Sequence, residues 1–302
     1  MKGSDKILMK KGIFFLAIAI IIIPCILITG CNSNKTIEAP FDASQPINVV
    51  SREDGSGTRV AFIELLGIEE KNADGTKKDH TTKEAIVTNK TDVMLINIAG
   101  DRYSIGYVSM GSLNNNVKTV KIDNVAISAE NVQNGTYKLT RPFNIAIKGK
   151  ASGLTKDFID FILSSEGQKV VAQNYISIDN DAPPYTRTKT AGKIVVAGSS
   201  SVTPVMEKLR EAYLSINPNA EIEVQQSDST SGMSGVINGT CNIGMASREL
   251  KDNEAAELTS IPIALDGIAI IVNPTNICNN LSSEQAKNIF TGKFTVWDEI
   301  FQ

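Results

Sequence analysis

Short apolar runs alternate with stretches of helical periodicity along most of this chain. The predicted strands lie at 47–50, 104–108, 117–122, 142–147, 194–197, 221–225 and 242–246. The predicted helices lie at 60–66, 91–99, 129–133, 155–175 with a break near 164–167, 204–216, 229–238 and 282–290. An apolar stretch at 261–271 is interrupted by Asp266 and Gly267, and 69–80 is predicted to be a surface loop. This alternation predicts an α/β fold with a mostly parallel sheet and helices on its faces.

Serine, threonine and glycine gather where predicted strands end and the next helix begins. Four such junctions lie at 51–58, 198–203, 227–232 and 247–248. Ligands of α/β sheets bind beyond the carboxyl ends of the strands, and a helix N-terminus offers unpaired N–H groups and a positive dipole end. Any one junction is equally compatible with ordinary helix capping. Four junctions in one chain favour a site for an anion.

The junction at 51–59 has the most specific composition, Ser-Arg-Glu-Asp-Gly-Ser-Gly-Thr-Arg. Arg52 supplies a planar fork that matches an oxyanion two bonds at a time. Ser56 and Thr58 add hydroxyl donors, and Gly55 and Gly57 let the backbone come close to a ligand. A loop with a plain helix cap remains the alternative.

Asp54 is the unexpected member of this junction, because a carboxylate repels a neighbouring anion. The repulsion is relieved if the anion carries a proton that it can donate to the carboxylate. Asp54 therefore predicts a protonated oxyanion, phosphate rather than sulfate.

Composition excludes several classes of function. The chain has 302 residues, a formal net charge of −3 and no basic cluster beyond its N-terminus, which argues against a nucleic-acid partner. Its only histidine, His80, lies in a charged loop, so the base that a serine hydrolase or phosphatase needs is missing. No Cys/His cluster or Gly-Lys-Ser/Thr motif is present. We predict a protein that is not an enzyme and that holds neither metal nor cofactor.

The N-terminus resembles a bacterial lipoprotein signal. Four lysines precede an apolar run at 13–28, and Leu-Ile-Thr-Gly leads into Cys31. We predict a signal peptide at 1–31 that ends at a lipidated Cys31, a tether at 32–45 and a location on the extracytoplasmic face of the cell membrane. An uncleaved membrane anchor is the alternative. Cys241 and Cys278 are left to form a disulfide or to serve as two small buried hydrophobes.

Most of the remaining chain resembles the phosphate-binding component of bacterial phosphate ABC importers. The segments that carry the resemblance are 48–62, 105–109, 157–168, 195–204, 229–232, 243–250, 266–274 and 284–297. The resemblance implies a two-lobed periplasmic-binding-protein fold of type II, with phosphate clamped between the lobes. The family has the segment like 193–297 first and the one like 47–178 second, so the order here resembles a circular permutation joined through 179–192. A fragment of a tandem fusion or a gene-model artefact is the alternative explanation of the order.

The resemblance also implies domain boundaries. One lobe is expected to be split over 46–142 and 272–302, and the other to be continuous over 145–268. Hinge strands are expected near 142–149 and 266–273.

The resemblance carries over individual site residues. The phosphate-binding residues that it implies are Arg52, Asp54, Ser56, Gly57, Thr58, Ser200, Ser201, Thr230, Ser231 and Ser247. Arg248 stands where some members have an aspartate, which leaves Asp54 as the sole expected acceptor for the phosphate proton. The implied partners are inorganic phosphate and a membrane permease, bound by a monomer. A sensor or adhesin on the same fold, or a binder of sulfate or molybdate, remains open.

Overall fold

The computed structural model describes residues 39–72, 76–186 and 190–301. The predicted signal peptide, Cys31 and the first part of the predicted tether lie outside the described residues. Within the described ranges, none of the helices combines the length and the apolar character needed to cross a membrane. Residues Phe41–Gln302 form one compact unit, which is described below.

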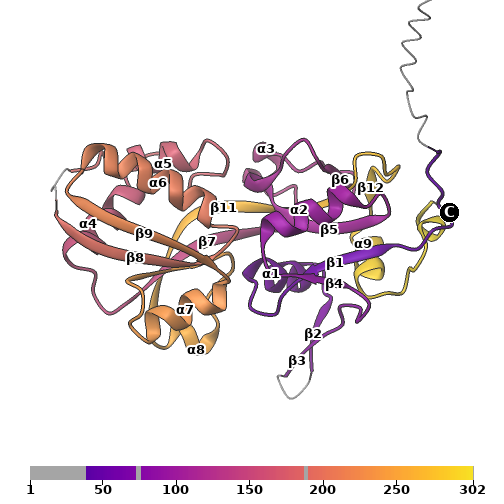
Figure 1. Ribbon diagram of the computed structural model, residues 1–302, viewed down its shortest axis with the longest axis horizontal. Coiled ribbons are helices and arrows are strands. Elements are labelled where there is room, and N and C mark those ends of the chain that lie inside the picture. The colour runs from indigo at the N-terminus through magenta and orange to yellow at the C-terminus, as the bar shows by residue number, and fades with distance from the viewer. Residues whose placement is uncertain (1–38, 73–75, 187–189, 302) are drawn as a thin grey trace, which may run out of the picture. The chain divides into compact units, whose positions relative to one another are not determined.

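A mixed sheet of ten strands runs through this unit (Figure 1). Its main path has the order β4-β1-β5-β11-β7-β10-β8-β9; β6 pairs with β11, and β12 pairs with β6. The strands are β1 (Asn48–Arg52), β4 (Ile86–Thr88), β5 (Ser104–Ser109), β6 (Lys118–Ile122), β7 (Thr140–Lys148), β8 (Gly192–Ser199), β9 (Ala220–Ser227), β10 (Ile243–Ala246), β11 (Leu258–Val272) and β12 (Asn280–Leu281).

The two ends of the sheet are parallel, but its centre is not. β1 pairs in parallel with β4 and β5, and β8 pairs in parallel with β9 and β10. Between these groups, β7 and β11 are antiparallel to each other and to their outer neighbours. The prediction of a mostly parallel sheet therefore holds for the two outer groups and is wrong for the strands that join them.

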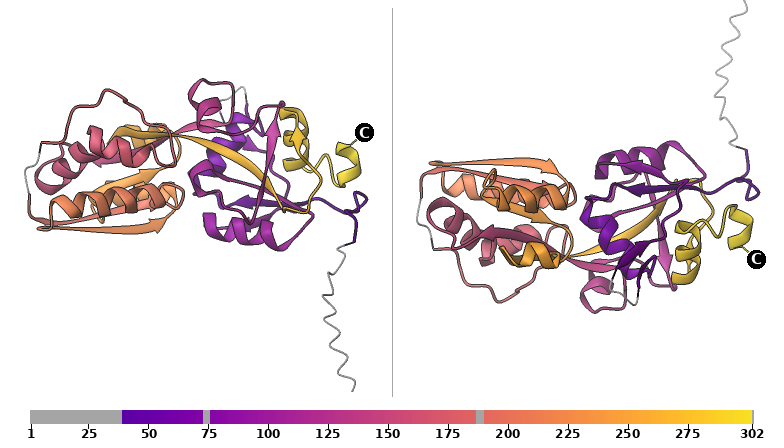
Figure 2. Two further views of the ribbon diagram at one scale, coloured as in Figure 1. Left: turned by 90° about the horizontal axis from the view of Figure 1, so that it is seen from above. Right: turned by 90° about the horizontal axis from the view of Figure 1, so that it is seen from below.

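β11 is one continuous strand of 15 residues with two sets of partners. Residues 258–267 pair with β7, and residues 268–272 pair with β5, while 270–272 also pair with β6 (Figure 2). The predicted interruption at Asp266 and Gly267 lies inside the strand. Asp266 is tolerated there because Arg141, its neighbour on β7, compensates its buried charge.

Helices cover the faces of the sheet, close to where the sequence predicts them. They are α1 (Gly57–Leu65), α2 (Thr91–Gly100), α3 (Ala129–Gln133), α4 (Gly153–Ile162), α5 (Ser165–Val171), α6 (Thr203–Ile216), α7 (Ser229–Ile237), α8 (Asp252–Ala255) and α9 (Ser283–Phe290). The predicted break near 164–167 is confirmed, because α4 ends at Ile162 and Ser164 caps α5 by accepting a hydrogen bond of 3.2 Å from Gly167 N at its Oγ. Two short 3₁₀ helices occur at Met110–Ser112 and Trp297–Ile300.

The buried apolar side chains of the described residues form four clusters, which we combine by chain segment into two groups, core A and core B. Core A is built from residues of 47–139 and 268–300, with Ile176 added. Core B is built from residues of 143–264. β7 and β11 are the strands that pass from one core to the other.

Some local predictions need correction. The segment predicted as a loop at 69–80 contains a hairpin of β2 (Glu69–Lys71) and β3 (Lys77–Asp79), supported by an ion pair of 2.7 Å between Lys77 and Glu69. The short elements β4 and α8 were not predicted. Cys241 and Cys278 are both free and buried, in core B and core A respectively, so they do not form the disulfide considered above.

The first and last described segments of the unit lie against each other. Ile47 N donates to Thr295 O at 2.8 Å, and Asp298 N donates to Ala43 O at 2.7 Å. Pro46 and Val296 form an antiparallel bridge between these contacts. Part of the predicted tether is therefore packed into the fold.

Candidate anion-binding site

Four helices of eight or more residues begin at one place between the two cores. α1 and α2 belong to the side of core A, and α6 and α7 belong to the side of core B. Side chains at or just before their first residues are in hydrogen-bond contact across this place, as described next. Each helix N-terminus favours a negative charge, because its dipole is positive there and its first N–H groups have no partner within the helix. Four N-termini at one place therefore offer many N–H donors to an anion.

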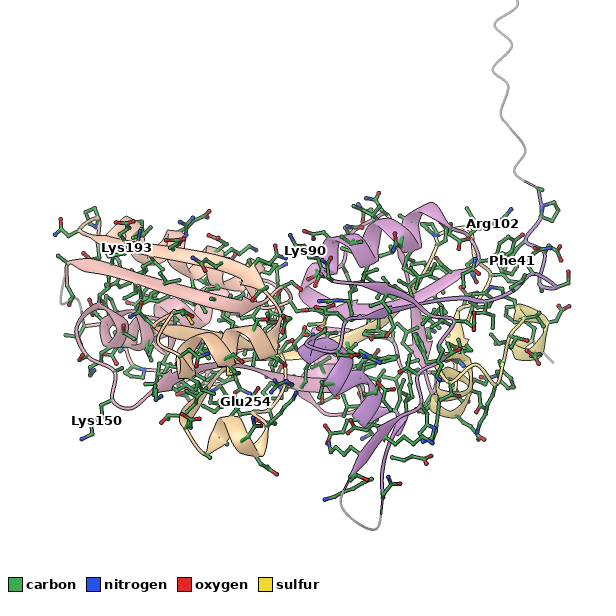
Figure 3. All side chains as sticks on the ribbon, turned by 60° about the horizontal axis from the view of Figure 1, so that its bottom comes forward. Phe41, Lys90, Arg102, Lys150, Lys193 and Glu254 are labelled. Carbon is green, nitrogen blue, oxygen red and sulfur yellow. The ribbon has the colours of Figure 1, made fainter. Side chains whose placement is uncertain are left out.

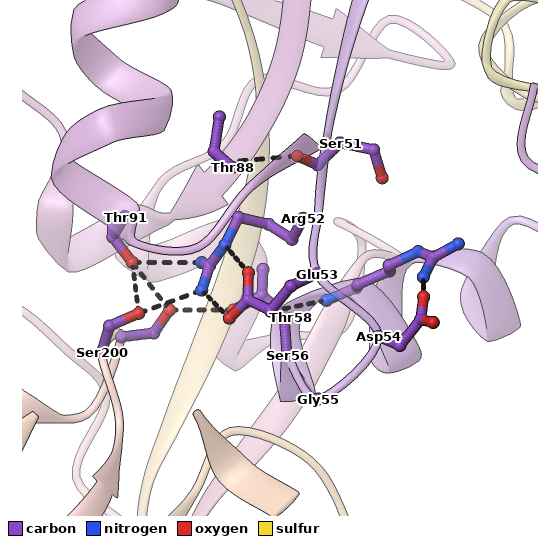
Figure 4. Close-up of polar contacts among 12 residues, drawn as sticks. Ser51, Arg52, Glu53, Asp54, Gly55, Ser56, Thr58, Thr88, Thr91 and Ser200 are labelled. Carbon is purple, nitrogen blue, oxygen red and sulfur yellow. Dashed lines mark hydrogen bonds and ion pairs between the residues drawn. The ribbon is translucent and has the colours of Figure 1, made fainter. Parts of the chain in front are cut away.

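A group of buried hydroxyls fills the space between these helix ends. Thr58 Oγ1 on α1 lies 2.8 Å from Ser201 Oγ. Thr91 Oγ1, at the start of α2, lies 3.2 Å from Ser200 Oγ and 3.3 Å from Ser201 Oγ (Figure 4). All four side chains are almost completely inaccessible to solvent. The hydroxyl cluster therefore joins residues from both cores in a water-excluded space.

Arg52, the last residue of β1, borders this cluster and is also buried. Its Nη2 donates to Ser200 Oγ at 3.1 Å, and its Nη1 donates to Thr91 Oγ1 at 3.4 Å. The same guanidinium donates to both carboxylate oxygens of Glu53, at 2.8 and 2.9 Å. Glu53 therefore neutralises the charge of Arg52, while the fork still presents donors to the hydroxyls.

A second group of serines continues the cluster on the side of core B. Ser199 Oγ donates to Ser247 Oγ at 2.9 Å, and Ser247 N donates to Ser229 Oγ at 3.1 Å. Gly57 lies against this group, since a Cβ atom placed on it would overlap Ser229 Oγ and lie 2.8 Å from Ser247 Oγ. Only glycine at position 57 allows the start of α1 to approach these serines so closely.

The structure thus brings together six of the ten residues that the resemblance implies. They are Arg52, Gly57, Thr58, Ser200, Ser201 and Ser247. Ser56 is buried next to them, but its hydroxyl caps α1 by accepting from Arg59 N at 3.3 Å. Whether these side chains contact an anion remains a prediction.

Thr230 and Ser231 have other hydrogen-bond partners. Thr230 N and Oγ1 both donate to Gly55 O, at 3.2 and 3.3 Å, which links α7 to the loop before α1. Ser231 N and Oγ both donate to the carboxylate of Asp228, the N-cap of α7. Their neighbour Ser229 takes the place in the cluster that was expected of them.

Asp54 is not brought to the cluster. Its side chain is 97% exposed and forms an ion pair with Arg59 (Figure 4). Arg59 also pairs with Asp79 at 2.6 Å. The expectation that this carboxylate faces the anion therefore lacks support from its position. Within the described ranges, the carboxylate that contacts the Arg52 side of the cluster belongs to Glu53 instead.

The guanidinium of Arg248 is paired with a carboxylate and does not offer an unpaired charge to the hydroxyl cluster. It forms a buried, two-pronged ion pair with Glu254 of α8, at 2.7 and 2.8 Å (Figure 3 labels Glu254). Its Nη2 also donates to Thr230 Oγ1 at 3.3 Å. Arg248 therefore supports the Thr230–Gly55 contact.

Sequence reasoning missed Thr91, Ser199 and Ser229. Thr91 was overlooked because the strand before it, β4, has only three residues and no apolar run long enough to predict it. Ser199 and Ser229 lie inside predicted junctions, but residue type alone does not distinguish them from Ser200, Thr230 or Ser231. Among the residues that the structure describes, His, Cys, Asp and Glu form no group that could hold a metal ion.

Comparison with known proteins identifies the family. The chain matches the PBP superfamily domain over residues 32–166 and 183–302. It is 50% identical over 277 residues to the phosphate-binding protein PstS 2 of Streptococcus agalactiae, covering 91% of this chain and 93% of that protein. This chain belongs to the PstS-like family of phosphate-binding proteins. Its relatives are binding proteins of transport systems, not enzymes, and its mixed α/β structure is the periplasmic-binding-protein fold.

Other PstS-like proteins match in two different ways. PstS 2 of Streptococcus pneumoniae serotype 4 is 44% identical over 88% of this chain and 92% of its own length. A crystal structure of a phosphate-binding protein of a phosphate ABC transporter from S. pneumoniae TIGR4 has a TM-score of 0.68, and the match covers 85% of this chain and 100% of that one. The PstS protein of Bacillus subtilis is 33% identical, but over only 37% of this chain and 38% of its own length.

Proposed function

We propose that this chain binds inorganic phosphate at the hydroxyl cluster and delivers it to the permease of an ABC importer. The observation that carries the proposal is the buried contact of Thr58 and Thr91 with Ser200 and Ser201, beside Arg52 and across the two cores. The names of the full-length relatives, which describe phosphate-binding proteins, support the choice of anion. A tetrahedral oxyanion would replace the hydroxyl–hydroxyl contacts with hydrogen bonds to its own oxygens.

The proposed ligands extend the set expected from the sequence. Arg52, Gly57, Thr58, Ser200, Ser201 and Ser247 stay in it, Ser56 contributes through its backbone, and Thr91, Ser199 and Ser229 are added. Thr230, Ser231 and Asp54 are proposed to support the loops around the ligand instead. Because Glu53 neutralises Arg52, most of the binding would come from hydroxyl and backbone donors.

This arrangement also bears on the choice between phosphate and sulfate. A hydroxyl oxygen can accept a hydrogen bond as well as donate one, so the cluster can receive the proton of hydrogen phosphate. Sulfate has no proton to give at neutral pH, so a hydroxyl that already donates its own proton to another group would face sulfate with an unpaired acceptor. A buried unpaired acceptor costs about 1–3 kcal/mol. We therefore expect preference for phosphate without a carboxylate facing the anion.

Titration calorimetry with phosphate, arsenate and sulfate tests the proposal. The wild-type chain is expected to bind one phosphate, and sulfate is expected not to compete. Thr58→Val keeps the shape of the buried side chain and removes its hydroxyl, so it should weaken phosphate binding about tenfold. Thr119→Val, on the exposed side of β6, is the matched control and should leave binding unchanged. Absence of phosphate binding by the wild type would reject the function.

We also propose that cores A and B correspond to two lobes that close on the ligand. Core membership supports boundaries near those expected, with one lobe split over 46–142 and 272–302 and the other continuous over 145–268. β7 and the middle of β11 are the proposed hinge strands.

The order of the segments is proposed to be a circular permutation within the family. The streptococcal relatives align with nearly the whole chain in its present order, whereas the B. subtilis protein aligns with little more than a third of it. The contacts of Ala43 with Asp298 and of Ile47 with Thr295 place the two ends of the folded unit side by side. Adjacent ends are the condition under which permutation is tolerated.

The site of action is proposed from the N-terminal sequence. A lipid on Cys31 would hold the chain on the extracytoplasmic face of the membrane, within reach of its permease. We propose that it acts there as a monomer.

A further inference from the structure

A buried ion pair lies where the chain passes from one core to the other. Arg141 of β7 is the cross-strand neighbour of Asp266 of β11. Two residues later, at Ile268, β11 begins to pair with β5. Asp266 is completely inaccessible to solvent, and Arg141 is 3% exposed. β7 and β11, which carry this pair, join the two cores. A movement of one core relative to the other would therefore bend or twist these strands.

The ion pair has a hydrogen-bond partner on each side of the crossing. Asp266 Oδ2 accepts from Arg141 Nε and Nη2 at 3.2 and 3.1 Å, and Asp266 Oδ1 accepts from Ser109 Oγ at 2.8 Å. Ser109 ends β5, which belongs to core A. The remaining nitrogen of the fork, Arg141 Nη1, donates at 2.9 Å to the backbone carbonyl of Ser247. One guanidinium–carboxylate unit therefore links core A to a residue of the hydroxyl cluster on the side of core B.

The geometry of the guanidinium matters for this link. Its donors lie at fixed positions in one plane, so a single arginine can hold Asp266 and the Ser247 carbonyl at a defined spacing. Lysine presents its donors from one point and cannot reproduce that spacing. Burial makes the link rigid, because a buried charge that loses a partner is strongly destabilised. The Ser247 backbone is thereby fixed relative to β11, and its hydroxyl is fixed relative to Ser199.

We propose that Arg141 is a positioning residue for phosphate, which holds Ser247 in the hydroxyl cluster from the crossing strands. The inference rests on the proposed function. Arg141 acts on the ligand through the Ser247 backbone, so its effect on binding depends on the Ser247 hydroxyl. The same bond couples the crossing of β7 and β11 to the geometry of the site.

A double-mutant cycle on the purified full chain tests this role. Arg141→Lys keeps a positive charge opposite Asp266 and removes the fork, so the dissociation constant for phosphate is expected to rise about tenfold. In the Ser247→Ala background the same substitution is expected to raise it less than about twofold, because the hydroxyl that it positions is absent. Asp266→Asn, measured with and without Ser247→Ala, should give the same pattern and serves if Arg141→Lys does not fold.

A matched control separates positioning from stability. Asp157 is another buried carboxylate, which accepts hydrogen bonds from the hydroxyls of Tyr185 and Tyr213 beside core B. Asp157→Asn is expected to lower the melting temperature and leave phosphate affinity unchanged. The positioning role is refuted if Arg141→Lys and Asp266→Asn bind phosphate like the wild type, or lose the same factor with and without the Ser247 hydroxyl. Failure of the wild type to bind phosphate would overturn the proposed function, and this inference with it.

Discussion

Gly57→Ala is expected to weaken phosphate binding with little effect on the folding of either core. Gly57 is the first residue of α1, where alanine is a better helix former than glycine. The added methyl, however, would overlap Ser229 Oγ and lie 2.8 Å from Ser247 Oγ, which belong to the other side of the site. Both serines are wholly buried and bonded to each other, so they have little room to move.

The size of this effect follows from the cost of overpacking. Forcing a methyl group into a filled space costs about 1–3 kcal/mol. If the whole cost falls on the closed arrangement that binds phosphate, the dissociation constant rises about 5-fold to about 150-fold. Calorimetry measures the affinity, and thermal melting of the ligand-free chain measures folding, which we expect to change by only a few degrees.

Gly100→Ala is the matched control, because Gly100 ends α2 and a Cβ atom placed there meets no atom within 4 Å. It should bind phosphate as tightly as the wild type. Ser229→Gly in the Gly57→Ala background removes the group that overlaps the methyl, so the double variant should bind phosphate more tightly than the two single losses of affinity, added together, would give. The reasoning about close approach fails if Gly57→Ala binds phosphate within about twofold of Gly100→Ala.

Three further predictions concern single residues. Asp54→Asn should leave phosphate affinity and selectivity over sulfate within about twofold by calorimetry, because its side chain is exposed and such pairs contribute little; a loss of selectivity would return the proton-acceptor role to Asp54. Burial raises the pKa of Asp266 from 3.8 to about 6, so the folded chain keeps a proton that the unfolded chain loses. The resulting stabilisation is complete below the unfolded value and lost as the pH rises through about 6. The urea midpoint of the wild type, minus that of Asp266→Asn, should accordingly decrease as the pH is raised from about 4.5 to about 6.5. A difference between the two midpoints that does not change with pH would contradict the raised pKa of Asp266. Cys31→Ser should move the protein from the membrane fraction to the soluble fraction on immunoblots, and continued retention would favour an uncleaved anchor.

The elements near the site were predictable because their signals are local. The run from Arg52 to Thr58 shows a strand end, two glycines and a helix start within a few residues, and the structure places it where the helix N-termini meet. Thr91 was not predictable in this way. It reaches the cluster only because β4 pairs with β1, and such a short strand has no periodicity to detect.

The sequence does not show which distant residue balances a buried charge, and this explains the wrong prediction of an interruption at Asp266. Asp266 interrupts an apolar run, and nothing near it in the sequence explains how its charge is tolerated. Its partner Arg141 lies 125 residues away, and the pairing follows only from the antiparallel register of β7 with β11. Asp54 shows that closeness in the sequence can also mislead. It lies two residues from Arg52, but this does not determine the direction of its side chain. It sits in a turn before α1, and its carboxylate faces solvent.

The continuity of β11 has a consequence for denaturation. Its residues 258–267 are hydrogen-bonded on the side of core B, and residues 268–272 on the side of core A, with no loop between them. Unfolding of one core would remove the hydrogen-bond partners of one part of β11, while the other part of the same strand is still in the folded core. A chain with two hydrophobic cores is therefore expected to unfold in a single cooperative transition.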